Sequence, residues 1–152
     1  MIVGLHHTAL STPDLERVVD FYRDLFGFQL EFEFAWDETN ENFKRTHAAP
    51  ETAGRVAMIS RDGARLEIFE YEKPAPRPLA SVPGNADHGL CHFCIQVEDI
   101  DTEYARLQAA GMPFLSGPVP QGNVKCCYGR DPDGNIIELI EYFDHIVEGE
   151  TE

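Results

Sequence analysis

His7-Thr-Ala-Leu-Ser-Thr-Pro-Asp14 returns 85 positions later as His92-Phe-Cys-Ile-Gln-Val-Glu-Asp99, with the His and the Asp in register. Further along, Asp62-Gly-Ala-Arg-Leu-Glu-Ile-Phe-Glu-Tyr71 returns 71 positions later as Asp133-Gly-Asn-Ile-Ile-Glu-Leu-Ile-Glu-Tyr142, with the Asp, the Gly, both Glu and the Tyr in register. Self-similarity of this kind indicates that one supersecondary unit was duplicated. The shift falls from 85 to 71 because the first copy is longer, most simply in the segment 37–50.

The first copy predicts the order βαβββ. Residues 2–12 alternate in character and end before a proline, which indicates a strand. Apolar residues at helical spacing then predict a helix over 14–26, with Thr12 as its cap, Pro13 at the first helical position and Gly27 at its end. Three further strands are predicted at 29–36, 55–60 and 65–71, the last two joined by a tight turn at 61–63.

The second copy repeats this order after a proline-rich linker that carries no periodicity. We predict strands at 90–97, 113–116, 125–129 and 135–142, and a helix at 100–110. The fold class is therefore α+β, a single domain with module one at 1–72, the linker at 73–88, module two at 89–144 and an acidic tail at 145–152. The extra segment 37–50 is too polar for core and is a candidate lid or dimer contact.

The composition is that of a folded globular chain. With 152 residues, 43% hydrophobic and 11% aromatic, it suits one domain with a real core. Twenty-seven acidic against 12 basic side chains give a net charge of −15, which repels nucleic acid phosphates and anionic lipid. No apolar run approaches the roughly 18 to 20 residues of a membrane span, and the N-terminus lacks the order of a signal peptide. We expect a cytoplasmic protein that binds neither nucleic acid nor membrane.

The four cysteines raise the question of zinc, because Cys91 and Cys94 have CxxC spacing. Residues three apart on a strand point to opposite faces, and the adjacent Cys126 and Cys127 also alternate, so these thiols are not expected to form a four-sulfur cage. We expect reduced, small, buried thiols.

Strand alternation predicts which side chains face a common cavity. In the second copy Phe93, Ile95 and Val97 are apolar and are expected to pack on the helix. The alternate residues of that strand then lie on the concave side of the sheet. The same parity applies to the first and last strands of both copies. Four polar side chains then share the concave side: His7, Glu67, His92 and Glu138.

Burying two imidazoles and two carboxylates on the concave side of a sheet removes them from water, which costs free energy unless partners compensate for it. A divalent metal supplies this compensation, and two nitrogen and two oxygen donors suit nickel, cobalt, iron, manganese or zinc. We therefore predict one metal site from these four residues, completed within a chain or across a dimer. The other histidines are assigned elsewhere: His6 is out of register and interpreted as a non-ligand, and His47, His88 and His145 are expected to be solvated.

The same motifs resemble those of the vicinal oxygen chelate superfamily, and the resemblance covers nearly the whole chain. The segments that carry it are His7–Leu15, Phe21–Gly27, Leu66–Phe69, His92–Val97 and Asp131–Leu139. The resemblance implies paired βαβββ modules in a U-shaped mixed sheet around a divalent metal, often a homodimer, and a small-molecule substrate that chelates the metal through neighbouring oxygens. The four predicted ligands look like the ligand set of glyoxalase I, and methylmalonyl-CoA epimerase is similar.

The leading hypothesis for function is a metal-dependent lyase, isomerase or epimerase that removes a proton next to a carbonyl. A metal would stabilise the charge that develops on the neighbouring oxygen. Glu138 is our choice of base, with Glu67 as the partner that returns the proton.

One departure from the resemblance bears on the substrate. Glyoxalase I enzymes commonly place an arginine four residues after the first ligand, where it helps to hold glutathione, and this chain has Ser11 there. Arg55 and Arg65 could bind an anion instead, but we interpret each as a surface strand residue. We therefore do not expect a glutathione adduct as the substrate.

Two other functions occur within the resemblance. An extradiol ring-cleaving dioxygenase needs three open positions on iron, and Glu67 as a fourth ligand leaves two. A non-catalytic binding protein of the bleomycin-resistance type would use the same fold to sequester a ligand, for which Trp36, Phe69 and Tyr71 offer an aromatic cavity. Such proteins typically lack the metal residues, so the intact set favours an enzyme.

Overall fold

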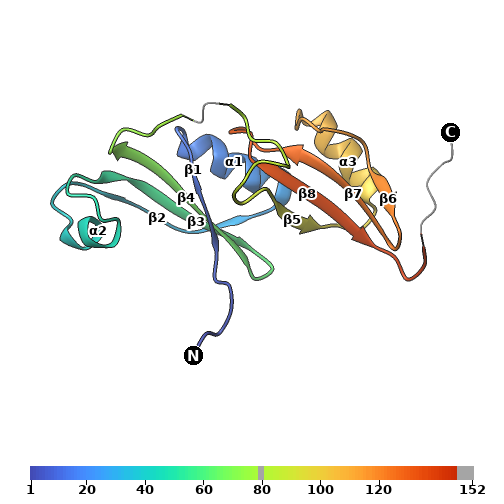
Figure 1. Cartoon of the computed structure of the whole chain (residues 1–152), viewed down its shortest axis with the longest axis horizontal. Helices are drawn as coiled ribbons and strands as arrows, with labels where there is room; N and C mark the ends of the chain where they lie inside the picture. Colours follow the sequence, from blue (N-terminus) through green and yellow to red (C-terminus); the bar gives the residue numbers. More distant parts are fainter. Residues whose placement is uncertain (79–80, 147–152) are drawn as a thin grey trace. The chain divides into compact units, whose positions relative to one another are not determined.

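The computed structural model describes residues 1–78 and 81–146. The chain divides into two compact units, Met1–Leu79 and Ala80–Glu152 (Figure 1). The boundary between them in the sequence falls within the predicted linker 73–88. The predicted acidic tail lies outside the described residues from position 147 onward. Among the described residues, no helix has both the length and the apolar character that crossing a membrane requires.

The first unit contains a four-stranded mixed sheet in the order β1-β4-β3-β2. Strand β1 is parallel to β4, and the other neighbours are antiparallel. Its elements are β1 (Thr8–Ser11), α1 (Leu15–Phe26), β2 (Gln29–Trp36), α2 (Glu41–Thr46), β3 (Ala53–Arg61) and β4 (Ala64–Lys73).

The second unit repeats this topology in the order β5-β8-β7-β6, again with the first strand parallel to the last. Its elements are β5 (Phe93–Gln96), α3 (Ile100–Ala109), β6 (Val119–Gln121), β7 (Val124–Arg130) and β8 (Ile136–Tyr142). The α+β fold class and the paired βαβββ modules are therefore confirmed.

The two faces of each sheet divide as strand alternation predicts. On β4, Leu66 and Ile68 are 4% and 0% exposed, and on β8, Ile137 and Leu139 are both 0% exposed. Helix α1 buries its apolar stripe against this side of the first sheet, including Tyr22. The intervening glutamates and aromatic residues point to the opposite side, so the face of each sheet away from the buried aliphatic residues carries polar side chains.

The helix cap is where the sequence prediction for α1 was wrong. Asp14, not Thr12, is the N-cap, and its side chain accepts a hydrogen bond from the backbone N–H of Arg17 at 3.1 Å. The Thr12 hydroxyl instead accepts a hydrogen bond from the Asp14 N–H at 3.1 Å, just before the helix begins. Gly27 ends the helix in the left-handed conformation with φ of 71°, as predicted.

The second glutamate of each repeated Glu-x-x-Glu motif holds the start of a helix. Glu70 accepts a hydrogen bond from the Leu15 N–H at 2.7 Å, at the first turn of α1. Glu141 accepts from the N–H groups of Asp99 and Ile100 at 2.9 and 3.0 Å, at the first turn of α3. A carboxylate satisfies unpaired N–H groups there and complements the positive end of the helix dipole. This repeated glutamate therefore joins each helix to its sheet.

We expect Glu141→Ala to lower the free energy of unfolding by about 2 kcal/mol, because two charge-assisted hydrogen bonds at a helix start are lost. Urea unfolding followed by circular dichroism measures this. The matched control is Glu98→Ala, which removes an exposed carboxylate of the same unit and should change stability by less than about 0.5 kcal/mol. Equal losses in the two variants would contradict the helix-start role.

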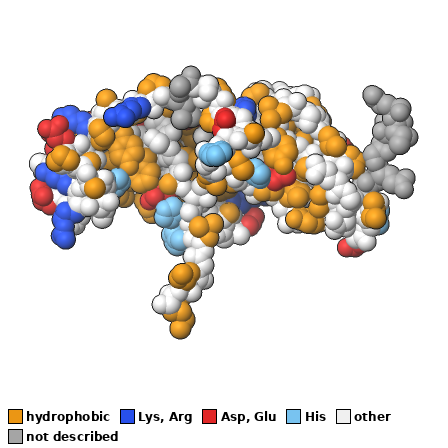
Figure 2. Space-filling view, viewed as in Figure 1, with side chains coloured by type: hydrophobic (Ala, Val, Ile, Leu, Met, Phe, Trp, Pro, Cys, Tyr) orange, Lys and Arg blue, Asp and Glu red, His pale blue; other side chains and the backbone are white. Residues whose placement is uncertain are grey.

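Three predicted strands were misplaced. Strand pairing begins only at β1 and β5, so residues 2–7 and 90–92 are not in strands. The segment before β1 extends away from the first sheet and carries exposed hydrophobic side chains (Figures 1 and 2). The strand predicted at 113–116 is a single bridge from Phe114 to Gly129, and the edge strand β6 forms further along.

The inserted segment 37–50 contains a short helix that the sequence analysis did not predict. Asn40 caps α2 by accepting a hydrogen bond from the Phe43 N–H at 3.1 Å. Phe43 stacks on Trp36 with ring centroids 4.6 Å apart, which fastens the insertion to the end of β2. Its predicted role as a lid or dimer contact stays a prediction.

Candidate metal centre and the neighbouring cavity

The first unit brings His7 and Glu67 together. His7 directly precedes β1, and Glu67 lies on the neighbouring parallel strand opposite Ala9. The Nε2 atom of His7 is 3.1 Å from Oε2 of Glu67, and the two side chains are 34% and 21% exposed. The Nδ1 atom of His7 lies 2.8 Å from Nδ1 of His6. One imidazole and one carboxylate are thus paired within solvent reach.

The second unit repeats the pair with His92 and Glu138. His92 directly precedes β5, and Glu138 lies on the neighbouring parallel strand opposite Cys94. The Nε2 atom of His92 is 3.2 Å from Oε2 of Glu138, with side-chain exposures of 30% and 13%. The repeat therefore reproduces the same atom pair at nearly the same distance.

The surroundings of the two glutamates differ. Glu67 has Ala9 and Met58 as its strand neighbours, and neither can donate a hydrogen bond from its side chain. Glu138 is flanked by Cys94 and by Tyr128, whose hydroxyl donates to Oε1 of Glu138 at 3.0 Å.

Burial, followed by the hydrogen bond to Glu138, raises the pKa of Tyr128 to about 12. Tyr128 therefore remains a protonated donor at neutral pH. The sequence analysis missed Tyr128, although the repeat and the hairpin register could have placed it opposite Glu138.

The atom pairs can be tested against the geometry of metal ligands. Nitrogen and carboxylate oxygen ligands bind zinc at about 2.0 to 2.2 Å, so two ligands at a right angle on one ion lie about 3 Å apart. The observed separations of 3.1 and 3.2 Å match that spacing, and both atoms of each pair belong to donor types that divalent transition metals accept. The residues present therefore fit a metal ion.

Each unit supplies only two of the four donors. Within residues 1–78 and 81–146, no group of three or more His, Cys, Asp and Glu side chains is placed to hold a metal ion. The same separations also suit a direct hydrogen bond between imidazole and carboxylate. A measurement of bound metal is the experiment that discriminates between the two.

The cysteines are free thiols, and the prediction of their burial was half right. Cys126 and Cys127 are buried, whereas Cys94 is exposed and Cys91 is partly exposed. Cys94 is exposed because it shares the open face of β5 and β8 with Glu138. Burial raises the pKa of Cys127 to about 11, so this thiol stays protonated at neutral pH.

The prediction that His47 is solvated was wrong. His47 ends α2, and its ring stacks on Phe43 and on Trp36 with centroids 5.1 and 6.1 Å apart. The reason lies in the inserted helix, which turns this histidine onto the aromatic end of β2. His88 and His145 are exposed, as predicted.

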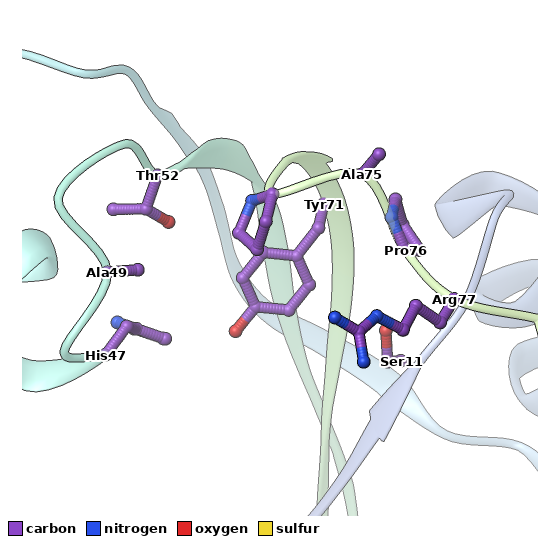
Figure 3. A pocket seen from close by; sticks show the side chains of 9 residues that line it. Ser11, His47, Ala49, Thr52, Tyr71, Ala75, Pro76 and Arg77 are labelled. Atoms are coloured by element: carbon purple, nitrogen blue, oxygen red, sulfur yellow. The ribbon is translucent and has the colours of Figure 1, made fainter.

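A cavity of about 490 Å³ lies in the first unit, where the insertion and the start of the linker meet the ends of β1 and β4 (Figure 3). His47, Ala49 and Thr52 line one side of it, and Ser11 and the linker residues line the other (Figure 3). Its size falls within the range of small-molecule sites. Ser11, the position that departs from the glyoxalase I pattern, therefore borders an open space.

The two arginines considered as anion binders are already ion-paired. Arg55 contacts Oε2 of Glu16 and Oε2 of Glu70, both at 2.8 Å. Arg65 contacts Glu31 at 3.0 Å. Their interpretation as strand residues that pair on the surface agrees with these contacts.

A family model described as Glyoxalase/Bleomycin resistance protein/Dioxygenase superfamily matches residues 4–139. The chain therefore belongs to this superfamily, which confirms the resemblance inferred from the repeat motifs.

Among curated relatives, the chain is 33% identical over 147 residues to a 2-epi-5-epi-valiolone epimerase from an Actinomyces species, a match that covers 91% of this chain and 79% of that protein. It is 30% identical over 141 residues to a probable lactoylglutathione lyase from Vibrio cholerae, covering 89% and 88%. The relatives thus include proteins named as an epimerase and as a lyase.

Solved structures show the same fold. A glyoxalase family protein from Bacillus cereus superposes with a TM-score of 0.85 at 20% identity, covering 94% of this chain and 96% of that one. A fosfomycin resistance protein from Listeria monocytogenes superposes with a TM-score of 0.62 at 19% identity, covering 97% and 94%.

Proposed function

We propose that the protein is a metal-dependent isomerase or lyase of the epimerase and glyoxalase type, which moves a proton next to a carbonyl in a small substrate. The metal would be held by four residues, one His–Glu pair from each unit: His7, Glu67, His92 and Glu138. The observation that carries the proposal is the repeated separation of 3.1 and 3.2 Å between Nε2 and Oε2, which is the spacing of neighbouring ligands on one ion.

The relatives support this class of chemistry. An epimerase inverts a stereocentre and the glyoxalase reaction moves hydrogen between neighbouring carbons, and the chain is 33% and 30% identical to proteins with these names. Both conversions require that a C–H bond next to a carbonyl be broken and remade. When bound, a divalent metal would supply electrostatic stabilisation of the charge that develops on the carbonyl oxygen.

The chain's own residues divide the proton transfer between two carboxylates. Glu138 accepts the proton from carbon and becomes a carboxylic acid, while Glu67 begins the cycle protonated and gives its own proton to the product. Proton exchange with water then restores both side chains. The Tyr128 hydroxyl donates a hydrogen bond to Oε1 of Glu138, which fixes the orientation of the carboxylate. Glu67 has no such donor beside it on β1 or β3 and is freer to turn. Glu138 is the more buried of the two, so less water competes for its proton.

The first experiment measures the metal content per chain of untagged wild-type protein beside the double variant Glu67→Ala, Glu138→Ala. We expect about one ion per wild-type molecule and less than about one tenth of that in the variant, because both carboxylate donors are removed. The variant Glu31→Ala, Glu98→Ala is the matched control, since it removes the same number of carboxylates outside the site. The ion should be nickel, cobalt, iron, manganese or zinc.

Failure to bind any of these ions in wild type would contradict the metal assignment. It would favour a second candidate, a non-catalytic binding protein of the same superfamily, because the cavity beside Tyr71 would still accept a small molecule. Oxygen uptake with catechols on the iron form would instead indicate the dioxygenase. Homodimer formation stays a prediction that light scattering of the same preparation tests.

A further inference from the structure

The cavity of the first unit lies on the same row of β4 as the predicted ligand Glu67. Glu67, Phe69 and Tyr71 alternate onto one face, and Tyr71 lines the cavity. Tyr71 lies four positions after Glu67 on the strand, about 13 Å along the chain. Burial, and then the charge of Glu67, raise the pKa of Tyr71, so this phenol keeps its proton at neutral pH. A substrate anchored near Glu67 can therefore extend along this row.

Arg77 supplies the cavity with an unused positive charge. It lines the cavity from the linker side, and its side chain reaches into the open space beside Ser11 (Figure 3). It forms no hydrogen bond or ion pair with the residues in 1–78 and 81–146, although the chain carries 27 acidic side chains. Arg55 and Arg65, by contrast, are paired with carboxylates. Arg77 is itself exposed, so it lies at the solvent-facing rim of the cavity. A guanidinium there that has no partner among the described residues is suited to bind a carboxylate through two parallel hydrogen bonds.

The opposite wall is aromatic and held in place by buried contacts. Trp36 is 5% exposed, and its indole N–H donates to the Thr52 hydroxyl at 3.0 Å. His47 stacks parallel to Trp36, and the ring of Tyr71 stands nearly perpendicular to it at 5.5 Å. Fixed flat rings of this kind favour planar ligand groups, since stacking then needs no reordering of the wall.

We propose that this cavity receives the end of the substrate that does not chelate the metal, and that this end carries a carboxylate attached to an aromatic or similarly planar ring. The assignment rests on the proposed function, and it narrows the substrate class. Arg77 pairs with the carboxylate, while His47 and Tyr71 contact the ring. Because the chain as a whole has a charge of −15, an anionic substrate needs such a local cation to bind.

The test uses metal-free protein and two probes of the same shape, the anion 3-phenylpropionate and the neutral 3-phenylpropan-1-ol. Trp36 is the one tryptophan of the chain and stacks on a residue of the cavity wall, so its fluorescence reports binding. In wild type at low salt we expect saturable binding of both probes, with the carboxylate bound at least tenfold more tightly. Arg77→Met should reduce that preference to less than threefold, because it keeps the chain length and removes the charge.

Two further variants distinguish the effect of the Arg77 charge on binding from the effect of the cavity volume. Arg45→Met removes another arginine of the first unit that does not line the cavity, and it should leave the preference unchanged. Ser11→Leu narrows the cavity without changing its charge, and it should lower the affinity for both probes about tenfold. Absence of saturable binding in wild type, or an undiminished preference in Arg77→Met, overturns the proposal.

A further variant distinguishes this proposal from the proposed function. The Glu67→Ala, Glu138→Ala protein should bind 3-phenylpropionate with wild-type affinity, since the probe does not use the metal donors. If wild-type protein binds the probe but holds no metal, the cavity proposal is retained and the proposed metal-dependent enzyme is rejected. With an identified substrate, Arg77→Met should raise KM at least tenfold and leave kcat within twofold.

Discussion

Glu138→Gln is expected to abolish turnover and leave the fold intact. The amide cannot accept a proton from carbon, whereas its oxygen can still accept the hydrogen bond from the Tyr128 hydroxyl, so the side chain keeps its place. Removing a general base typically costs 10² to 10⁴ in rate, and we expect a loss of at least about 10³.

Solvent exchange gives the sharpest measurement of this effect. Candidate α-hydroxy and α-keto carbonyl compounds are incubated with metal-loaded protein in D₂O, and NMR follows deuterium entering the carbon next to the carbonyl. The control Glu98→Gln makes the same chemical change at an exposed position of the second unit and should exchange at the wild-type rate. Unfolding midpoints of the variants verify that the fold is retained.

The companion variant Glu67→Gln tests the division of roles. If Glu67 returns the proton, this variant should still introduce deuterium into recovered substrate while product formation falls. Full exchange in Glu138→Gln together with none in Glu67→Gln would reverse the two assignments. Retained turnover in both variants would reject proton abstraction by either carboxylate.

Gly54→Ala is expected to destabilise the first unit by about 3 kcal/mol. A methyl group at Gly54 would meet the backbone oxygen of Glu70 and two ring carbons of Trp36, the latter at 2.9 and 3.0 Å. The indole is held by Thr52 and Phe43 and has little room to give. Overpacking of this kind costs about 1 to 3 kcal/mol or more, and here a rigid carbonyl is one of the obstacles.

Urea unfolding of Gly54→Ala followed by Trp36 fluorescence reports on the affected unit. Gly117→Ala is the control, because its added methyl group would meet only ordinary contacts at 3.9 and 4.0 Å with Tyr104. Displacement of Trp36 should also weaken 3-phenylpropionate binding, since the indole backs the wall that carries His47. A Gly54→Ala protein as stable as wild type would show that β3 tolerates a side chain at this point.

The sequence predicted the repeated elements well because local pattern and tertiary contacts agree there. Strand β2 was predicted with its observed bounds, Gln29–Trp36, and α3 was predicted within one residue. Strand parity put His7 and Glu67, and likewise His92 and Glu138, on the same side of the sheet, but it did not predict that each histidine contacts the glutamate of its own unit. The spacing of 3.1 and 3.2 Å within each pair required side-chain geometry that no pattern contains.

The errors arose where structure depends on a partner strand or on a tertiary contact. Residues 2–7 alternate like a strand, but alternation alone cannot supply the neighbour that a strand needs for its hydrogen bonds. The short α2 has too few residues for a helical period, and Phe43 fixes it by stacking on Trp36. His47 lines the cavity from the insertion and Arg77 lines it from the linker. Neither segment has a periodic pattern, so the sequence analysis assigned His47 to solvent and did not consider Arg77.

The unequal neighbours of Glu67 and Glu138 bear on the history of the duplication. A chain rebuilt from two copies of the first module would keep the glutamate on each inner row but place Met58 where the second module has Tyr128. A chain built from two copies of the second would carry that phenol twice and would lack the segment 37–50 that walls the cavity. The two modules are therefore no longer interchangeable. The chain depends on the second module for Tyr128 and on the first for the segment 37–50.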